Sequence, residues 1–417
     1  MIIIILVFNF KMTAGVLMQL AAAGEQDKYI IGNPELTHFK KSYKRHTNFS
    51  IGQIPQYFME SADFGKKATC LIDKKGDLLN DMILELELPA LQTNVSWINS
   101  AGHHIIEYVE LVLSGISVCK MTGQFLDIYS QLTVPYGKRA AYYQMVAYNS
   151  VSSYNKNTQE GSLRLFIPLP FWFCKDFGSS LPLIAMQHTD VRVVVKFRPF
   201  SECWYSGTSM STTPSNKSIT TALIMCDYIY LDTFERKKFA STMNLEYLIE
   251  QVQTQDANAV RAGEINDNYS LYLNHPVKTI YWIYQADGVI STNDWGNYSR
   301  TLDDDTVIQT KQSPLDFVTF RLNGHERIER KHSNYFRYVE QYKRHTNSSV
   351  GFVYSYNFSL KPDSTQPYGS CNFSRIESCV FSMEFPSTIL AGQIKFFATN
   401  YNILRIKNGM SGLAFTS

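Results

Sequence analysis

The sequence predicts an all-β protein made of two antiparallel β-sandwiches in tandem. Segments in which apolar and polar residues alternate with a period of two recur along the chain, and this pattern is typical of strands with one buried face. Helical periodicity is sparse and no β-α-β alternation occurs, so a doubly wound parallel sheet is disfavoured. The length of 417 residues favours two domains of about 200 residues over a single one.

The composition indicates a folded protein of nearly neutral charge. Charged residues make up 18% and aromatic residues 14%, which is the opposite of the balance in a disordered chain. The net charge of +2 gives no electrostatic basis for nucleic acid as the principal partner. The seven cysteines are dispersed, odd in number and free of any C-x-x-C pair, so we expect buried thiols in a reducing compartment rather than disulfides.

The first half contains two clear strand patterns and one helix pattern. Three leucines of residues 82–88 point to one face and two glutamates point to the other, and residues 191–198 alternate in the same way. Residues 124–132 place apolar side chains at i, i+3, i+4 and i+7, which predicts a short helix.

A polar segment without periodicity, residues 206–221, predicts a loop between the two domains. Residues 223–232 resume as a strand. We therefore divide the chain into an N-terminal segment (residues 1–24), a first sandwich (25–221) and a second sandwich (222–417). The usual eight-stranded form of such a sandwich is the jelly roll, which gives two tandem jelly rolls with short helices in the connections.

In the second half, residues 244–252 again show helical spacing, with Asn244 as a candidate N-cap. Residues 352–360 and 379–385 alternate with a period of two and are predicted strands.

A ten-residue phrase occurs twice, as Tyr-Lys-Arg-His-Thr-Asn-Phe-Ser-Ile-Gly at residues 43–52 and with two changes at residues 342–351. Each copy lies just before an apolar, β-rich stretch, which suggests two related units. Coincidence or a shared local turn is the alternative. We expect the phrases at the lower rim of each sandwich, where the chain enters its strands.

Several longer stretches of the chain are distinctive. The first three are Met-Thr-Ala-Gly-Val-Leu-Met-Gln-Leu at residues 12–20, Gly-Glu-Gln-Asp-Lys-Tyr-Ile-Ile-Gly-Asn-Pro at 24–34, and Phe-Lys-Lys-Ser-Tyr-Lys-Arg-His-Thr-Asn-Phe at 39–49. Others follow at residues 76–79, 161–183, 227–236, 246–251, 274–277, 322–327, 369–376 and 400–406. In these stretches and in their order, over about nine-tenths of its length, the chain resembles the major capsid proteins of large nucleocytoplasmic DNA viruses.

The resemblance implies a double jelly roll whose homotrimers are pseudo-hexagonal capsomers that tile an icosahedral shell. It implies a structural virion protein rather than an enzyme, without a cofactor, assembled in the host cytoplasm, without direct contact to nucleic acid. The implied partners are further copies of the chain in the trimer and in neighbouring capsomers, together with minor capsid and penton proteins. Two alternatives stay open. One is a minor capsid or scaffold paralogue of the same fold; the other is a carbohydrate-binding β-sandwich that uses aromatic residues at 281–284 and Trp295.

Residues 1–11 depart from the family, whose members usually begin near what is here Met12. A misassigned start codon is the explanation that we favour. The alternative is an apolar extension that inserts beneath the shell, towards the internal membrane that virions of the family carry.

The candidate assembly residues are Arg45 and His46 in the first phrase and Arg344 and His345 in the second. An arginine at a rim can pair with carboxylates or carbonyls of a neighbouring subunit. An ion pair within the chain, or a solvated turn, is an equally good explanation.

Two loops, residues 206–221 and 295–311, are candidates for the outer surface, and their sequons make Asn216 and Asn297 the glycosylation candidates. The three adjacent aspartates at 303–305 can bind a cation, although such a run is more often solvated. No nucleotide-binding, serine-hydrolase or metalloprotease motif is present. His103 and His104 are adjacent and would point to opposite faces of a strand, so we assign no metal site and no catalytic residue.

Overall fold

The computed structural model describes residues 14–92, 95–148, 162–205, 213–242, 244–302 and 312–416. The chain forms two units, Met1–Thr47 and Asn48–Ser417, which are described separately. The described part of the first unit holds two short helices, α1 (Ala14–Ala21) and α2 (Lys28–Ile31), neither of which buries a side chain. Among the described residues, no helix has the length and apolar character needed to cross a membrane.

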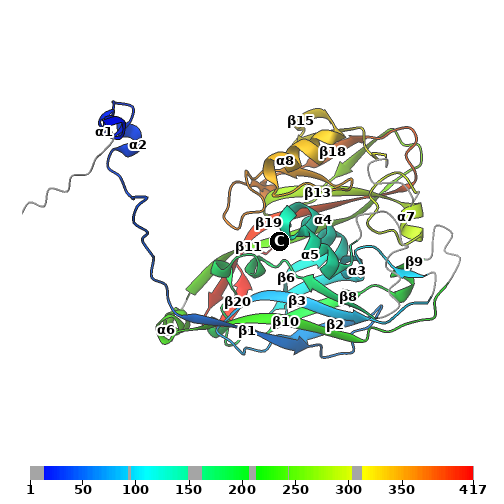
Figure 1. The fold of residues 1–417 in the computed structure, drawn as a ribbon. Helices are drawn as coiled ribbons and strands as arrows, with labels where there is room; N and C mark the ends of the chain where they lie inside the picture. The colour runs from blue at the N-terminus through cyan, green and yellow to red at the C-terminus, as the bar shows by residue number, and fades with distance from the viewer. Residues whose placement is uncertain are drawn as a thin grey trace, which may run out of the picture. The chain divides into compact units, whose positions relative to one another are not determined.

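The first half of the second unit is a sandwich of two four-stranded antiparallel sheets (Figure 1). The first sheet, in pairing order, consists of β1 (Phe49–Tyr57), β10 (Thr221–Leu231), β3 (Leu78–Leu88) and β7 (Leu163–Pro168). The second consists of β2 (Lys67–Leu71), β8 (Val191–Phe197), β5 (Ile106–Leu113) and β6 (Ile116–Thr122). A short pair, β4 (Ser96–Trp97) and β9 (Trp204–Tyr205), lies among the connections.

The second half repeats this architecture. One sheet consists of β11 (Asn244–Val260), β19 (Gly392–Lys407), β13 (Pro276–Ala286) and β16 (Tyr354–Asn357), with β17 (Cys371–Asn372) paired to β13 and β20 (Met410–Leu413) paired to β19. The other consists of β12 (Asn266–Ser270), β18 (Cys379–Glu384), β14 (Phe317–Leu322) and β15 (His325–His332).

The two sandwiches share one topology. When the short strands β4, β9, β17 and β20 are left out and the others are numbered within each half, they pair in the order first, eighth, third, sixth in one sheet and second, seventh, fourth, fifth in the other. Each half is therefore an eight-stranded antiparallel sandwich of the same topology, and the predicted fold class, two jelly rolls in tandem, is confirmed.

The boundary that the sequence placed at residue 221 is wrong in detail. Strand β10 pairs with β1 on one side and β3 on the other, so it is the eighth strand of the first sandwich. The first sandwich therefore extends through Leu231, and helix α6 (Thr233–Ser241) connects it to the second.

Side-chain alternation explains the strands that the sequence predicted. In β3 the leucines at 84, 86 and 88 are buried and the intervening glutamates are half-exposed, and β18 alternates in the same way. In the second sandwich the buried face is aromatic. The Trp282 ring stacks on that of Tyr354, at a centroid distance of 5.9 Å, and meets that of Phe381 at 5.2 Å across the two sheets. Interlocked aromatic faces of this kind supply much of the apolar burial that holds a sandwich together.

Another prediction was wrong. Residues 244–252 form the start of β11 rather than a helix, because this segment pairs with β19 along its whole length. The strand predicted over residues 352–360 is confirmed as β16, but it is shorter than predicted and is buried on both faces.

The connections carry the helices α3 (Ala101–His104), α4 (Gly123–Thr133), α5 (Tyr136–Val146) and α7 (Asp287–Ser291), and the continuous helical segment η7 (Tyr335–Val339) and α8 (Glu340–Arg344). The predicted helix at 124–132 is confirmed as α4, which the Thr122 hydroxyl caps by accepting from the Phe125 backbone N–H at 3.2 Å. Gly123 begins α4 where a Cβ would lie 2.2 Å from the carbonyl oxygens of His103 and Ile106. His103 and His104 lie in α3 and not on a strand, because backbone hydrogen bonds to Ser100 close a helical turn there.

Candidate assembly surfaces

The first jelly roll covers the outer face of the β11-β19-β13-β16 sheet with helix α4 (Figure 1). The ring of Phe125, which is 1% exposed, lies 6.1 Å from that of Tyr281 on β13 and 6.0 Å from that of Phe397 on β19. Near the helix N-terminus, Gln124 Nε2 donates to Gln285 Oε1 at 2.6 Å, and Lys395 Nζ donates to Gln124 Oε1 at 3.0 Å. This contact makes the two rolls one packed body.

A buried ionic triad lies beside this helix. The Glu250 carboxylate of β11 binds Lys175 Nζ of the first roll at 2.6 Å and Lys278 Nζ of β13 at 2.5 Å. Burial opposes the charge on Glu250, but the two ammonium groups outweigh it, so the pKa of Glu250 is lowered. Burial and repulsion from Lys175 lower the pKa of Lys278 to about 8, although the attraction of Glu250 opposes this shift. The triad therefore joins the two rolls through charges that would be costly to leave unpaired.

The connecting loops of the two rolls also meet. Trp295 Nε1 donates to the Glu202 carbonyl at 3.0 Å, and the Arg198 guanidinium lies 3.9 Å from the Trp295 ring centroid. Tyr298 donates its hydroxyl to Asp127 Oδ2 at 3.0 Å in the buried interior. These contacts fix the relative position of the connecting loops of the two rolls.

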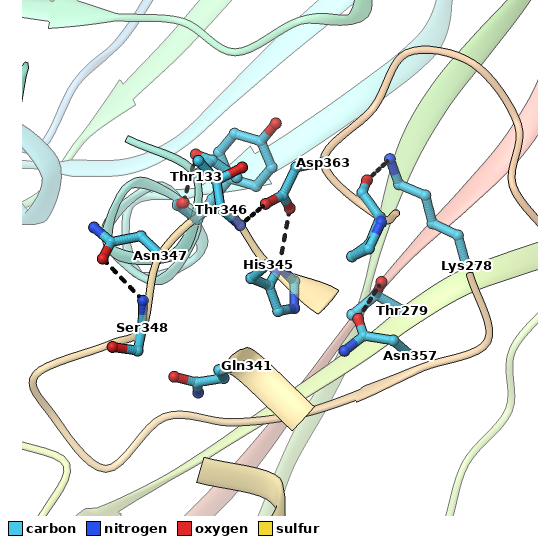
Figure 2. A network of polar contacts seen from close by, with 12 residues as sticks. Thr133, Lys278, Thr279, Gln341, His345, Thr346, Asn347, Ser348, Asn357 and Asp363 are labelled. Carbon is cyan, nitrogen blue, oxygen red and sulfur yellow. Dashed lines mark hydrogen bonds and ion pairs between the residues drawn. The ribbon is translucent and has the colours of Figure 1, made fainter. Parts of the chain in front are cut away.

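The second copy of the repeated phrase is part of this interface (Figure 2). The buried ring of His345 contacts Asp363 Oδ1 through Nδ1 at 2.9 Å, and the Thr346 backbone N–H donates to Asp363 Oδ2 at 2.6 Å. Asn347 donates its backbone N–H to the Leu132 carbonyl at 2.9 Å, at the end of α4. Arg344, at the end of α8, is half-buried. His345 is therefore held within the chain, which was the alternative to an intersubunit role.

The first copy has a different structure. Residues 43–47, with Arg45 and His46 among them, are exposed, and His46 Nδ1 lies 2.7 Å from the Thr47 carbonyl oxygen. Residues 49–52 then begin β1. The second copy instead starts in α8 and ends before β16, so the two phrases do not occupy equivalent positions. The expectation that both copies enter a sandwich at its lower rim was wrong for the second, because helix formation and the contact with Asp363 fix its course.

The glycosylation candidates also differ. Asn216 is exposed, whereas Asn297 is 4% exposed and its Nδ2 donates to the Thr301 carbonyl at 3.0 Å. A glycan on Asn297 would require this loop to open, so the geometry leaves Asn216 as the candidate. The aspartates at 303–305 lie outside the described residues.

The aromatic residues considered for carbohydrate binding are not accessible. Tyr281, Trp282 and Tyr284 are at most 2% exposed in β13, and Trp295 is buried by its contacts with the first roll. Within the described ranges, no cluster of three or more His, Cys, Asp or Glu side chains has the geometry to hold a metal ion. Burial lowers the pKa of His104 to about 3, so this ring is neutral at physiological pH.

Comparison with known proteins decides the family. Residues 37–232 match the family described as the major capsid protein N-terminus, and residues 235–412 match the family described as the large eukaryotic DNA virus major capsid protein. The chain belongs to the major capsid protein family of large eukaryotic DNA viruses. It is a structural protein of this family, and its relatives are named as components of virus capsids. The two matched ranges meet next to α6, where the structure places the boundary between the rolls.

The relatives cover almost the whole chain. The chain is 35% identical to the major capsid protein of Pyramimonas orientalis virus over 97% of its own length and 100% of that protein, and 30% identical to that of Paramecium bursaria Chlorella virus 1 over the same shares. A solved structure described as the PBCV-1 virus capsid has 28% identity and a TM-score of 0.78, covering 91% of this chain and 100% of that one. The Faustovirus major capsid protein, at 13% identity and a TM-score of 0.72, covers 94% of this chain and 96% of its own and shows the same fold.

Sequence reasoning missed the residues that join the two rolls. The available signal was Lys278, a lysine inside the otherwise apolar run that became β13. A charge in a buried strand requires a partner, but Glu250 and Lys175 could not be identified as that partner until the sheets were placed.

Proposed function

We propose that this protein forms homotrimers that act as pseudo-hexagonal capsomers in an icosahedral shell. Three chains around one axis present six jelly rolls of the same topology, so a threefold oligomer approximates sixfold symmetry. Such a unit can pack in a hexagonal lattice. Contacts within the trimer should be of the obligate kind, about 2,000 Å² or more, while contacts between capsomers can be weaker because many act together.

The observation that carries this proposal is the fixed relation between the two rolls. A lattice with six similar lobes requires that each chain hold its two lobes at one angle. Phe125, Glu250 and Trp295 provide this through apolar packing, the ionic triad and the loop contacts.

Light scattering of the purified protein, with negative-stain images of the same peak, tests the proposal. We expect a stable species near three times 47.8 kDa with a hexagonal outline. A monomer over a wide range of concentration would contradict it.

A minor capsid or scaffold paralogue of the same fold is the second candidate, and the similarity to the family is compatible with both. Quantitative mass spectrometry of purified virions separates them. A major capsid protein should be the most abundant shell component, whereas a paralogue should be present at a small fraction of that amount.

We further propose that the shell assembles in the host cytoplasm with minor capsid and penton proteins, and that the N-terminal segment faces the internal membrane. The exposed apolar side chains of α1, among them Met18 and Leu20, support the last point. Flotation with liposomes should retain the full chain and lose a chain that lacks residues 1–24.

A further inference from the structure

The two jelly rolls have the same topology, but the described residues cover the outer sheet face of the second roll only. In the second roll that face lies under α4, where Phe125 packs on the cross-strand pair Tyr281 and Phe397. In the first roll the equivalent face, on β1, β10, β3 and β7, leaves Ile83 and Met225 half-exposed.

The register of the two rolls can be matched residue by residue. Gln56 of β1 accepts the Asp73 backbone N–H at 3.3 Å, and Gln255 of β11 accepts the Tyr272 backbone N–H at 3.2 Å, so the two glutamines hold the same place in their sandwiches. Gln56 pairs with Ile224 and Gln255 pairs with Phe396.

Counting one residue onward, Met225 corresponds to Phe397. Met225 pairs across the sheet with Ile83, as Phe397 pairs with Tyr281. Ile83 and Met225 are therefore the counterparts of the pair that Phe125 covers.

The second roll also has a counterpart of α4. In the first roll the turn at Ser114 and Gly115, both with positive φ, leads through β6 to α4. In the second roll the turn at Asn323 and Gly324, again both with positive φ, leads through β15 to η7 and α8.

Aligning the buried glutamines Gln131 and Gln341 matches the two helical segments. It places Leu126 opposite Phe336, and both of these side chains are buried in their own roll.

This alignment identifies a mostly aromatic stripe, which is exposed except for the half-buried Tyr335, whose hydroxyl donates to Glu340 Oε1 at 2.8 Å. The residues Phe125, Ile128, Tyr129 and Leu132 of α4 correspond to Tyr335, Tyr338, Val339 and Tyr342, which we call the aromatic stripe. Ile128 and Leu132 are fully buried, whereas Tyr338 is 48% and Tyr342 is 87% exposed.

In the part of the chain that the structure describes, the first roll thus has an uncovered face and the second roll has an uncovered stripe. Each is the counterpart of a surface that is buried between the rolls.

We propose that the aromatic stripe of one chain docks on the outer face of the β1-β10-β3-β7 sheet of a second copy, with Tyr335 over Ile83 and Met225. The contact repeats between chains the packing that α4 makes within one chain. Stripe and face are different surfaces, so the contact is head-to-tail and generates a closed ring when its rotation closes. This inference rests on the proposed trimer and identifies which surfaces form it.

Charge complementarity supports a second copy as the occupant. The outer face carries Asp81 and Asp227, and among the described residues no lysine or arginine pairs with either carboxylate. Exposed Lys331 and Lys343 lie next to the two ends of the stripe, and in the described part of the chain neither forms an ion pair. Docking brings these opposite charges to the same interface.

The first test is the double variant Tyr338→Asp/Tyr342→Glu. Both side chains are exposed in the chain, so the fold should persist, as checked by circular dichroism, while light scattering should show the mass falling from about three chains to one. Tyr272→Glu, at a tyrosine that is 84% exposed and so comparable with Tyr342, is the matched control and should remain trimeric. A double variant that stays trimeric would overturn the inference and leave the proposed trimer intact. A monomeric wild-type protein would instead overturn the trimer itself.

A second test locates the contact without weakening it. Replacement of Tyr338 by the photoreactive p-benzoylphenylalanine should give, on illumination, a covalent dimer on a denaturing gel. Peptide mapping should place the bond in β1, β3 or β10, with Met225 as the preferred target because benzophenones react readily with methionine. The same probe at Tyr272 should not reach these strands. Crosslinks from residue 338 of an intact trimer to other surfaces alone would refute the proposed docking.

Discussion

The buried triad between the two rolls gives a quantitative prediction for Glu250→Gln. This change removes one charge and leaves Lys175 and Lys278 without their shared partner in a site that is almost fully enclosed. Removal of one member of a buried ion pair typically costs about 3–5 kcal/mol. The same strand offers a matched control, because Glu246 pairs with Arg405 at 2.8 Å on the surface, with both side chains about half-exposed. Glu246→Gln should cost about 0–1 kcal/mol.

Urea unfolding followed by tryptophan fluorescence measures both variants against the wild type at one protein concentration. We expect the Glu250→Gln midpoint to fall several-fold further than that of Glu246→Gln. If the two variants lose the same stability, the triad does not hold the rolls together and the electrostatic argument is refuted.

The pH dependence of stability in the wild type and in Glu250→Gln tests whether the charge of Glu250 is responsible for the loss. The pKa of Glu250 is lowered in the folded protein from its ordinary value of 4.5. Its stabilisation is therefore fully present above that ordinary value and is lost as the pH falls through the lower, folded-state pKa. The difference between wild type and Glu250→Gln should shrink on acidification, whereas a difference that persists at low pH would indicate a packing defect.

Three further predictions follow from single residues. Burial, together with repulsion from Arg198, lowers the pKa of Lys395 from 10.5 to about 8. Between these two pH values the unfolded chain binds more protons than the folded one, so the stability of the wild type relative to Lys395→Gln should rise from pH 8 to 10.5 by at most about 3 kcal/mol. A stability difference that stays constant over this range would argue against a buried ammonium group. Gly123→Ala should lower the free energy of unfolding by about 3 kcal/mol, measured with denaturant, because the added Cβ would lie 2.2 Å from two carbonyl oxygens. The control Gly137→Ala in α5, where no atom lies within 4 Å of the added Cβ, should be neutral or stabilising by up to about 1 kcal/mol. Equal effects of the two substitutions would contradict the steric argument. Burial raises the pKa of Asp363, but the hydrogen bonds that its carboxylate accepts from His345 and Thr346 outweigh burial, so this pKa is lowered. Asp363→Asn should therefore lose about 1–3 kcal/mol of stability at neutral pH, and progressively less as the pH falls through the folded-state pKa of Asp363. A loss of stability that does not depend on pH would show that the charge is not involved.

The sequence predicted those features whose information is local. Alternation in β3 and β18 follows from a pleated strand with one buried face, and the spacing in α4 follows from 3.6 residues per turn with Thr122 as cap. The order of motifs along the chain identified the family, and with it the double jelly roll.

Residues 244–252 show where local pattern fails. Leu245, Leu248, Ile249 and Val252 fit a helical stripe, yet Leu245 and Ile249 also lie on one face of a strand, and Leu248 is 44% exposed. Pairing with β19 decides in favour of the strand, and β19 lies about 150 residues away, so the ladder is invisible to a local pattern.

The repeated phrase shows that one local sequence can adopt two different structures in the same chain. The phrase is identical at eight of ten positions, yet the first copy is exposed up to residue 47 and then enters β1, whereas the second copy ends helix α8 and continues into a segment that buries His345 and Ser349. Asp363 and the end of α4 fix the second copy, and both are contributed by other parts of the chain.

The sequence by itself therefore determined the strands with one solvent-exposed face, the helix α4, the two β-rich halves and the family. Only the tertiary structure decided that β10 completes the first roll, that Glu250 joins the rolls, and that the described residues of one chain leave the first roll's outer face and the aromatic stripe uncovered. The physical reason is that periodicity is set by neighbours along the chain, whereas sheet pairing, charge pairing and burial are set by residues that meet only after folding.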